Sequence, residues 1–245
     1  MGYGNRTLLD LLAEADELIR ARTRMTVYDG PFRGMRLLDA VSWGAGDLGP
    51  KLLGTYEREV QETIADLARN RYDAVVDIGC AEGYFAVGCA RLFPDTPVHG
   101  YDTNPQAVRI LALAAEANGV ADRVHAHGLC DPAELARLAG LHPRLLVISD
   151  CEGYEKTLFT HPPTVEALKH ADLIIECHDF LDPTITGNLM AHLQFTHTLS
   201  VLTSGPRNPN AFPFLAHVSD GVRWAAVQEG RPCAMHWLVC RARRP

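Results

Sequence analysis

A short stretch of acids and glycines near residue 80 has the composition of a cofactor-binding turn. Residues 75–85 read VVDIGCAEGYF, so an apolar run ends around Asp77 and is followed by Gly79 and Gly83. Glycines at such a turn adopt backbone conformations closed to other residues and let a ligand approach the main chain. A dinucleotide site has the spacing G-x-G-x-x-G, with a pyrophosphate on the helix N-terminus. Here the spacing is G-x-x-x-G, and the Asp77 carboxylate would repel a pyrophosphate but suits an ammonium group.

A second acid stands at the end of the next apolar run. Residues 98–102 read VHGYD, and Asp102 lies 23 residues after Gly79. A carboxylate in this place can accept hydrogen bonds from both hydroxyls of a ribose. The glycine turn should be essential for the cofactor, and we expect Gly79→Val to abolish cofactor binding in a protein that still folds.

Two further apolar runs end in ionisable residues. Residues 149–155 read SDCEGYE, and residues 174–179 read IIECHD. Residues two apart on a strand share a face, so Glu176 and His178 should point the same way. His178 is the first candidate for a general base, because histidine titrates near neutral pH, and Asp150 is the second.

The same residues could instead hold a metal. Three of them have the ligand types that a divalent ion such as Mg²⁺ or Mn²⁺ prefers: Asp150, Glu176 and His178. Asp179 or Glu152 could add a further ligand, and a bound ion would lower the pKa of a substrate hydroxyl. The alternative is structural, with Glu152 and Glu176 paired to arginines such as Arg207 or Arg223.

Strands and helices alternate from residue 72 onward, which would bring these side chains to one edge of a sheet. Short apolar runs predict strands over 74–78, 98–101, 123–127, 145–149 and 173–177, and later over 196–202 and 234–240. Helical spacing predicts helices over 84–93, 105–118, 132–139 and 163–170. Asn104 before Pro105 and Asp131 before Pro132 are typical helix starts. This alternation favours a mostly parallel sheet with ligands at the carboxyl ends of its strands.

The N-terminal part has a different pattern. Amphipathic helices are expected over 7–22 and 51–68, with glycine-rich loops over 28–50 between them. We expect residues 1–70 to form a helical extension or lid, in which Trp43 takes part, over a domain of residues 71–245. Acceptor specificity should lie in this extension and in the segment 181–235.

The motifs together resemble those of class I methyltransferases dependent on S-adenosylmethionine (SAM). Over residues 72–180, the pattern D-x-E-G-x-E at 150–155, followed by a strand ending in E-x-H, is similar to the FkbM-like methyltransferases. Cys151 replaces the usual apolar residue in that pattern. The resemblance implies an α/β, Rossmann-like fold, with a mostly parallel central sheet and helices on both faces. It also implies SAM as cofactor and a small-molecule acceptor, typically a hydroxyl of a natural product or sugar.

The residues expected to contact SAM follow the first four strands. They are Asp77, Gly79, Cys80, Ala81, Gly83, Tyr84, Asp102, Thr103, Leu129, Cys130 and Asp150. The turn 128–130 would edge the adenine, and Tyr84 would help to close the methionine end. Simple packing is the alternative for Tyr84 and Cys130.

Composition narrows the class of protein. A net charge of −7, from 30 acids against 23 bases, disfavours nucleic acid as a partner. The seven cysteines contain no C-x-x-C spacing and favour reduced thiols in a cytoplasmic protein. No signal peptide and no membrane-spanning run is evident. The amphipathic N-terminal helix could serve a homodimer.

Three other functions stay open at this point. N-methylation of a small molecule is scarcely distinguished from O-methylation by these residues. A nicotinamide-dependent oxidoreductase is disfavoured by the missing third glycine. A SAM-binding protein without methyl transfer is disfavoured by the ionisable residues at the strand ends.

Overall fold

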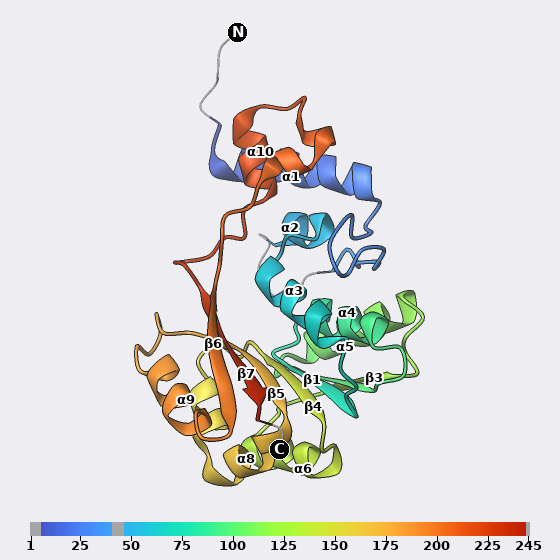
Figure 1. Cartoon of the computed structure of the whole chain (residues 1–245). Coiled ribbons are helices and arrows are strands. Elements are labelled where there is room, and N and C mark those ends of the chain that lie inside the picture. The colour runs from blue at the N-terminus through green and yellow to red at the C-terminus, as the bar shows by residue number, and fades with distance from the viewer. Residues whose placement is uncertain (1–5, 41–46, 244–245) are drawn as a thin grey trace.

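A computed structural model describes residues 6–40 and 47–243, and these form one mixed sheet of seven strands (Figure 1). The strands are β1 (Ala74–Ile78), β2 (Val98–Tyr101), β3 (Val124–His127), β4 (Leu145–Ser149), β5 (Asp172–Cys177), β6 (His197–Thr203) and β7 (His236–Ala242). Their order in the sheet is β3-β2-β1-β4-β5-β7-β6, and only β7 runs antiparallel to its neighbours. The predicted α/β fold with a mostly parallel sheet is confirmed.

The central strands are buried on both faces, which explains their continuous apolar sequences. Every residue of β1, β4 and β5 is buried. One face is covered by α3 (Arg58–Leu67), α4 (Tyr84–Leu92) and α5 (Pro105–Ala117). The other is covered by α6 (Pro132–Leu141), α7 (Glu155–Thr160), α8 (Pro162–Ala167) with the short turn η1 (Leu168–His170), and α9 (Ile185–Leu193). A parallel sheet needs this double cover.

The predicted helix starts are present. The Asn104 side chain accepts a hydrogen bond from the backbone N–H of Gln106 (2.9 Å), and Asp131 accepts one from Glu134 (2.8 Å). The single helix expected over 51–68 is wrong, because α2 (Leu48–Leu53) ends at Gly54 before α3 begins. Gly54 has φ +81°, and a Cβ there would lie 2.0 Å from the carbonyl oxygen of Asp29. This close backbone approach ends the helix.

The N-terminal helices join a segment from the other end of the chain. Helix α1 (Leu8–Thr23) packs against α10 (Asp220–Ala226), which follows the turns η2 (Pro209–Ala211) and η3 (Pro213–Leu215) between β6 and β7. We call residues 8–23 and 205–230 the cap. Its apolar core includes Ile19, Leu215 and Val222, and it extends to Leu52 and Leu53 of α2. Figure 1 shows the cap at one end of the molecule, with α2 between it and the sheet. The domain boundary at residue 70 stays a prediction, and Trp43 lies outside the described residues.

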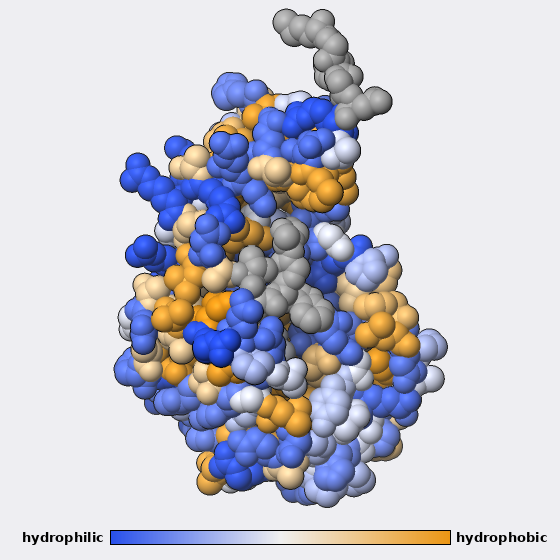
Figure 2. Space-filling model, turned by 180° about the vertical axis from the view of Figure 1, so that it is seen from behind, coloured by the Kyte–Doolittle hydropathy of each residue, from blue (hydrophilic) through white to orange (hydrophobic). Residues whose placement is uncertain are grey.

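One face of the molecule mixes hydrophilic and hydrophobic surface. Seen from behind, hydrophobic residues form separate patches among hydrophilic ones on both the cap and the body (Figure 2). Within the described ranges, no helix has the length and apolar character needed to cross a bilayer. All seven cysteines lie in these ranges, and each is unpaired.

Candidate active site

The glycine turn lies directly against the segment that follows β4. Gly79 has φ +81° and Gly83, which starts α4, has φ +91°. A Cβ on Gly79 would stand 1.6 Å from the carbonyl oxygen of Asp150. The glycine turn and the segment that follows β4 are therefore in backbone contact. Neither can move away unless β1 and β4 separate. The expectation that Gly79→Val still folds is incompatible with this contact.

Asp102 ties the glycine turn to the end of β2. Its Oδ2 accepts a hydrogen bond from the backbone N–H of Ala81 (2.9 Å), and its Oδ1 accepts one from Asn104 (2.7 Å). A carboxylate oxygen has two lone pairs, so each can accept another hydrogen bond. Thr103 lies beside it and is exposed. The geometry leaves Asp102 able to bind hydroxyls while it fixes the turn.

Asp77 is a buried carboxyl with an open acceptor. Its residue is 3% exposed, and burial, followed by the nearby Asp150, raises its pKa to about 8. The backbone N–H of Ala86 at the start of α4 counters this rise. Among the described residues, the Asp77 Oδ2 atom has no hydrogen-bond partner. A buried acceptor without a partner costs free energy, so this position favours a ligand that donates, above all a cation.

Two hollows lie on either side of the glycine turn. The one at the strand ends is about 470 Å³ and is rich in acids, with lining residues that include Lys51, Tyr56, Glu57, Asp77, Asp150 and Trp237. The other is about 540 Å³ and is more apolar, with Leu38, Leu48 and Ile110 in its lining. Both are bounded by Tyr84 and by the ion pair between Lys51 and Glu82. An elongated ligand could therefore lie along the turn.

His178 is held by one carboxylate and faces two others. Its Nδ1 lies 2.8 Å from Oε1 of Glu155, a fully buried residue of α7. Because a carboxylate only accepts, Nδ1 carries the proton and Nε2 is left 3.4 Å from Asp150 and 3.5 Å from Glu152. Burial lowers the pKa of His178, but Glu155, Asp150 and Glu152 outweigh it and raise the pKa overall. The ring is thus oriented with Nε2 toward the acids.

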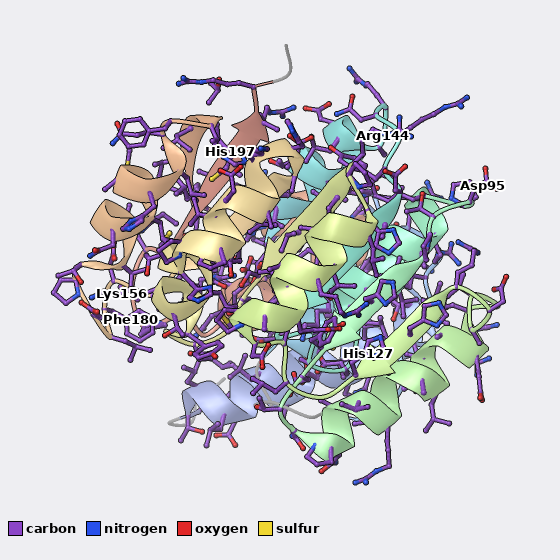
Figure 3. The ribbon with its side chains drawn as sticks, turned by 90° about the horizontal axis from the view of Figure 1, so that it is seen from below. Asp95, His127, Arg144, Lys156, Phe180 and His197 are labelled. Carbon is purple, nitrogen blue, oxygen red and sulfur yellow. The ribbon has the colours of Figure 1, made fainter. Side chains whose placement is uncertain are left out.

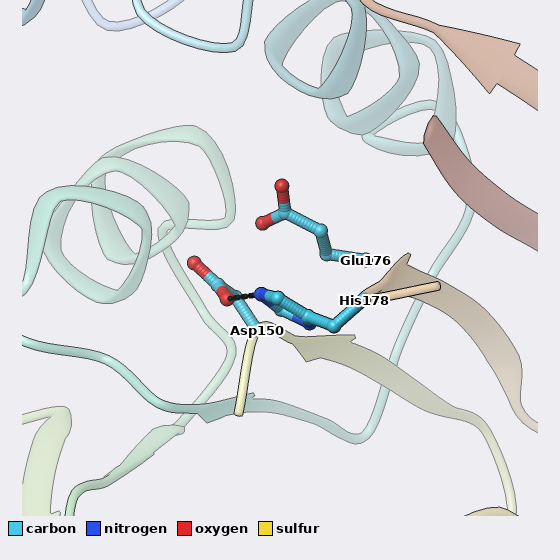
Figure 4. Close-up of side chains that lie close together, drawn as sticks. All are labelled: Asp150, Glu176 and His178. Carbon is cyan, nitrogen blue, oxygen red and sulfur yellow. Dashed lines mark ion pairs between the residues drawn. The ribbon is translucent and has the colours of Figure 1, made fainter. Parts of the chain in front are cut away.

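Glu176 completes the group, as Figure 4 shows. One ligand atom each from Asp150, Glu176 and His178 lies within 4.8 Å of the other two. The two strand-end motifs therefore meet as the sequence predicted. Asp179 turns elsewhere and binds Thr186 (2.7 Å) and His236 (3.1 Å).

The arginine beside Glu176 is Arg231, and neither of the two named from the sequence takes that place. The Arg231 guanidinium contacts Glu176 (2.9 Å), Glu57 (3.0 Å) and Glu229 (3.0 Å). It also lies over the rings of Tyr56 (5.8 Å) and Trp237 (5.1 Å). Arg207 pairs with Glu59 and Glu229, and Arg223 pairs with Asp220. Even with Arg231 present, burial, Glu57 and Asp150 raise the pKa of Glu176, so a bound cation would favour its charged form.

Sequence reasoning missed several of these residues. Glu155 closes the D-x-E-G-x-E pattern but received no role. Tyr56 and Glu57 lie between α2 and α3, and Arg231 follows the cap. No spacing in the sequence links these three residues to the strand ends.

Some predicted cofactor residues are almost fully buried or lie away from the hollows. Cys80 and Cys130 are buried in the two core clusters, and burial raises the pKa of both thiols, that of Cys130 to about 12. Cys80 still lies in the lining of the hollow at the strand ends, whereas Cys130 lines neither hollow. Leu129 is 58% exposed, and it lines neither hollow. Tyr84 is buried and donates to the carbonyl oxygen of Lys51 (3.3 Å).

A family model described as the methyltransferase small domain matches residues 44–138, which include the glycine turn and Asp102. No curated protein matches the chain in sequence.

Three solved structures are similar at low identity. Precorrin-6y C5,15-methyltransferase from Geobacter metallireducens GS-15 is 14% identical, with TM-score 0.50, over 76% of this chain and 89% of that one. Cofactor-bound Rv0187 from MTB is 13% identical, with TM-score 0.48, over 98% and 93%. The O-methyltransferase TomG from Streptomyces achromogenes, involved in tomaymycin synthesis and solved with SAM, is 14% identical, with TM-score 0.48, over 95% and 90%. The chain thus has the Rossmann-like fold of class I methyltransferases, and its residues 44–138 match the methyltransferase small domain.

Proposed function

We propose that the protein transfers a methyl group from SAM to a hydroxyl of a small molecule, with a divalent ion held by Asp150, Glu176 and His178. One observation carries this proposal. The open carboxylate of Asp77 and the Asp150 end of the three-residue group line the same hollow. A cationic cofactor at the first and an acceptor oxygen at the second would therefore lie side by side.

The residues fit SAM in three places. The open Oδ2 of Asp77 suits an ammonium group, and the acid-rich lining suits the sulfonium. Asp102 keeps lone pairs for the ribose hydroxyls. Gly79 and Gly83 keep the turn free of side chains, so that a ligand can approach its backbone. When bound, SAM would supply an electrophilic methyl group.

Asp102→Ala is expected to weaken the binding of S-adenosylhomocysteine about 10–30-fold, the effect of losing roughly two hydrogen bonds. The loss also frees the N–H groups of Ala81 and Asn104, so the turn itself becomes less ordered. Isothermal titration measures the change. The exposed Asp95, labelled in Figure 3, gives the matched control Asp95→Ala, which should bind normally. Unchanged affinity in Asp102→Ala would remove this residue from the site.

The group of Asp150, Glu176 and His178 fits a metal by its ligand types and by the carboxylate that orients its histidine. Two carboxylates and an imidazole suit Mn²⁺ or Mg²⁺. The Glu155–His178 contact has the form of the outer carboxylate that fixes the ring of a metal-binding histidine. An ion there would supply a Lewis acid that lowers the pKa of the acceptor hydroxyl. Arg231 can keep its ion pairs with Glu57 and Glu229 while Glu176 turns to the ion.

His178 could also act alone as the general base. The same contact with Glu155 orients the ring so that its Nε2 can take a proton from an acceptor hydroxyl. For this step, Nε2 must no longer be paired with Asp150 or Glu152. The metal-ligand role and the general-base role of His178 predict different results, because only the metal-ligand role needs a metal for activity. Chelation followed by readdition of Mg²⁺ or Mn²⁺ separates them.

Two exposed apolar side chains border the acceptor side. Phe180 is 46% exposed with its ring 5.7 Å from that of His178, and Leu181 is 55% exposed beside Gly153. An acceptor with an apolar part next to its hydroxyl would cover them.

Phe180→Ala is accordingly expected to raise the acceptor KM about three- to tenfold, roughly the contribution of a partly buried aromatic ring, with SAM affinity unchanged. Phe195 is 76% exposed just before β6, at the opposite end of the sheet, where Figure 3 labels the neighbouring His197. Phe195→Ala is the control. Equal KM values for both variants would place the acceptor elsewhere.

The proposal is tested by incubating the protein with labelled SAM and paired panels of hydroxylated and amine-bearing small molecules. Methyl ethers that form only with a divalent ion support it. Methylation of amines alone would assign N-methylation, and binding of SAM without any transfer would make the protein a SAM-binding protein.

A further inference from the structure

Four histidines gather at the edge of the sheet, outside both hollows. His99 lies on β2, His125 and His127 lie on β3, and His142 follows α6. In the register, His99 pairs with His125, and Tyr101 pairs with His127, so these side chains share the face covered by α6. Figure 3 looks onto this face and labels His127 beyond the helix. We call His99, His125, His127 and His142 the histidine cluster.

Two of the four rings are in direct contact through a hydrogen bond. The Nδ1 atom of His99 lies 3.2 Å from Nε2 of His127, and one of these two nitrogens carries the proton. Two imidazole nitrogens on a tetrahedral ion are about 3.3 Å apart, as follows from Zn–N bonds of roughly 2.05 Å. The ring centres of His125 and His142 lie 5.2 and 6.0 Å from that of His99. The pair is thus already at ligand spacing, with two more imidazoles beside it.

The facing nitrogens of His99 and His127 share one proton in their hydrogen bond. A metal ion would take the place of that proton, because metal binding to imidazoles releases protons. Nearby Glu134 is engaged by Arg137 (2.6 Å) and by the hydroxyl of Tyr101 (2.6 Å). The charged groups beside the cluster therefore already have partners of their own.

We propose that the histidine cluster binds a divalent transition-metal ion through His99 and His127, with His125 as the third ligand. Imidazoles select Zn²⁺, Cu²⁺ or Ni²⁺ over Mg²⁺, so this site differs in chemistry from the oxygen-rich group at the strand ends. His125 is exposed, and its ring can rotate toward the pair. The ion would fasten the edge strand β3 to β2 just before the turn 128–130. This metal site does not depend on the proposed methyl transfer.

The test uses the full-length chain without a histidine tag, in a His178→Ala background so that the strand-end group cannot contribute. The metal-stripped protein is titrated with Zn²⁺ against a chromophoric chelator. We expect one Zn²⁺ per chain, with affinity lowered roughly tenfold or more by His127→Gln and by His125→Gln. Mg²⁺ in excess should not compete.

His192→Gln is the matched control, because His192 is exposed on α9 and its Nδ1 contacts only the backbone of its own helix among the contacts found. Thermal unfolding without metal confirms that each variant folds, and the exposed His125 makes its variant safe in this respect. Bound Cu²⁺ should show the spectrum of an imidazole-ligated ion, which His127→Gln loses. Equal Zn²⁺ affinity in all three variants, or no Zn²⁺ bound in the background protein, would overturn the proposal.

Discussion

Replacing His178 by alanine should lower turnover roughly 10²–10⁴-fold, the usual contribution of a positioned acid–base group. The ring contacts Glu155, Asp150 and Glu152, and none of its described contacts joins it to Asp77, to Asp102 or to the glycine turn. Affinity for S-adenosylhomocysteine should therefore stay close to that of the unaltered protein. Steady-state rates and isothermal titration on the same preparation measure the two effects.

His161→Ala is the control, because His161 is exposed and its contact is to Thr164 in α8. It should retain full turnover. If chelation abolishes the activity of the unaltered protein and His178→Ala no longer retains the metal, the residue acts as a ligand. If chelation has no effect, His178 acts as the base. Near-normal turnover of His178→Ala would contradict both roles.

Gly79→Ala is expected to lower the free energy of unfolding by more than about 4 kcal/mol, a loss seen only when a mutation disrupts a core feature. The new Cβ would lie 1.6 Å from the carbonyl oxygen of Asp150 and 2.7 Å from its carbon. Both are backbone atoms at the end of β4, so no side-chain rotation can relieve the clash. The yield of soluble protein and chemical denaturation measure the effect.

Gly119→Ala separates this clash from backbone strain. Gly119 also has a positive φ, +67°, but no described atom lies within 4 Å of a Cβ placed there. Its alanine variant should lose only about 1–2 kcal/mol, the cost of the left-handed conformation. If Gly79→Ala were as stable as Gly119→Ala, the contact between the glycine turn and Asp150 would be wrong.

The sheet could be predicted because its strands are buried on both faces. β1, β2 and β4 begin and end where the apolar runs do, and the capping residues Asn104 and Asp131 mark helix starts. Local chemistry decides such features. The break at Gly54 could not be predicted, since it depends on the carbonyl of Asp29, which folding brings against it.

The site likewise contains residues that the sequence predicts and residues that it does not. Asp77 lies near the end of β1, and Asp102 and Asp150 directly follow β2 and β4. Parallel strands end at one edge of the sheet, so the proximity of these acids could be predicted from spacing. Arg231 contacts Glu57, which lies far from it in the sequence, through the chain that leaves the cap. Hydrophobic periodicity in the sequence cannot predict such a long-range ion pair. The side-chain packing of Cys80 and Cys130 was likewise invisible, because a turn residue can face a ligand or the core.

The most direct test of the central claim is calorimetric titration with S-adenosylhomocysteine, performed on chelated protein before and after addition of Mg²⁺ or Mn²⁺, with NAD as the comparison ligand. We expect saturable binding of one S-adenosylhomocysteine per chain, weakened in Asp102→Ala, and no binding of NAD. Saturable binding of NAD with none of S-adenosylhomocysteine, under either metal condition, would contradict it.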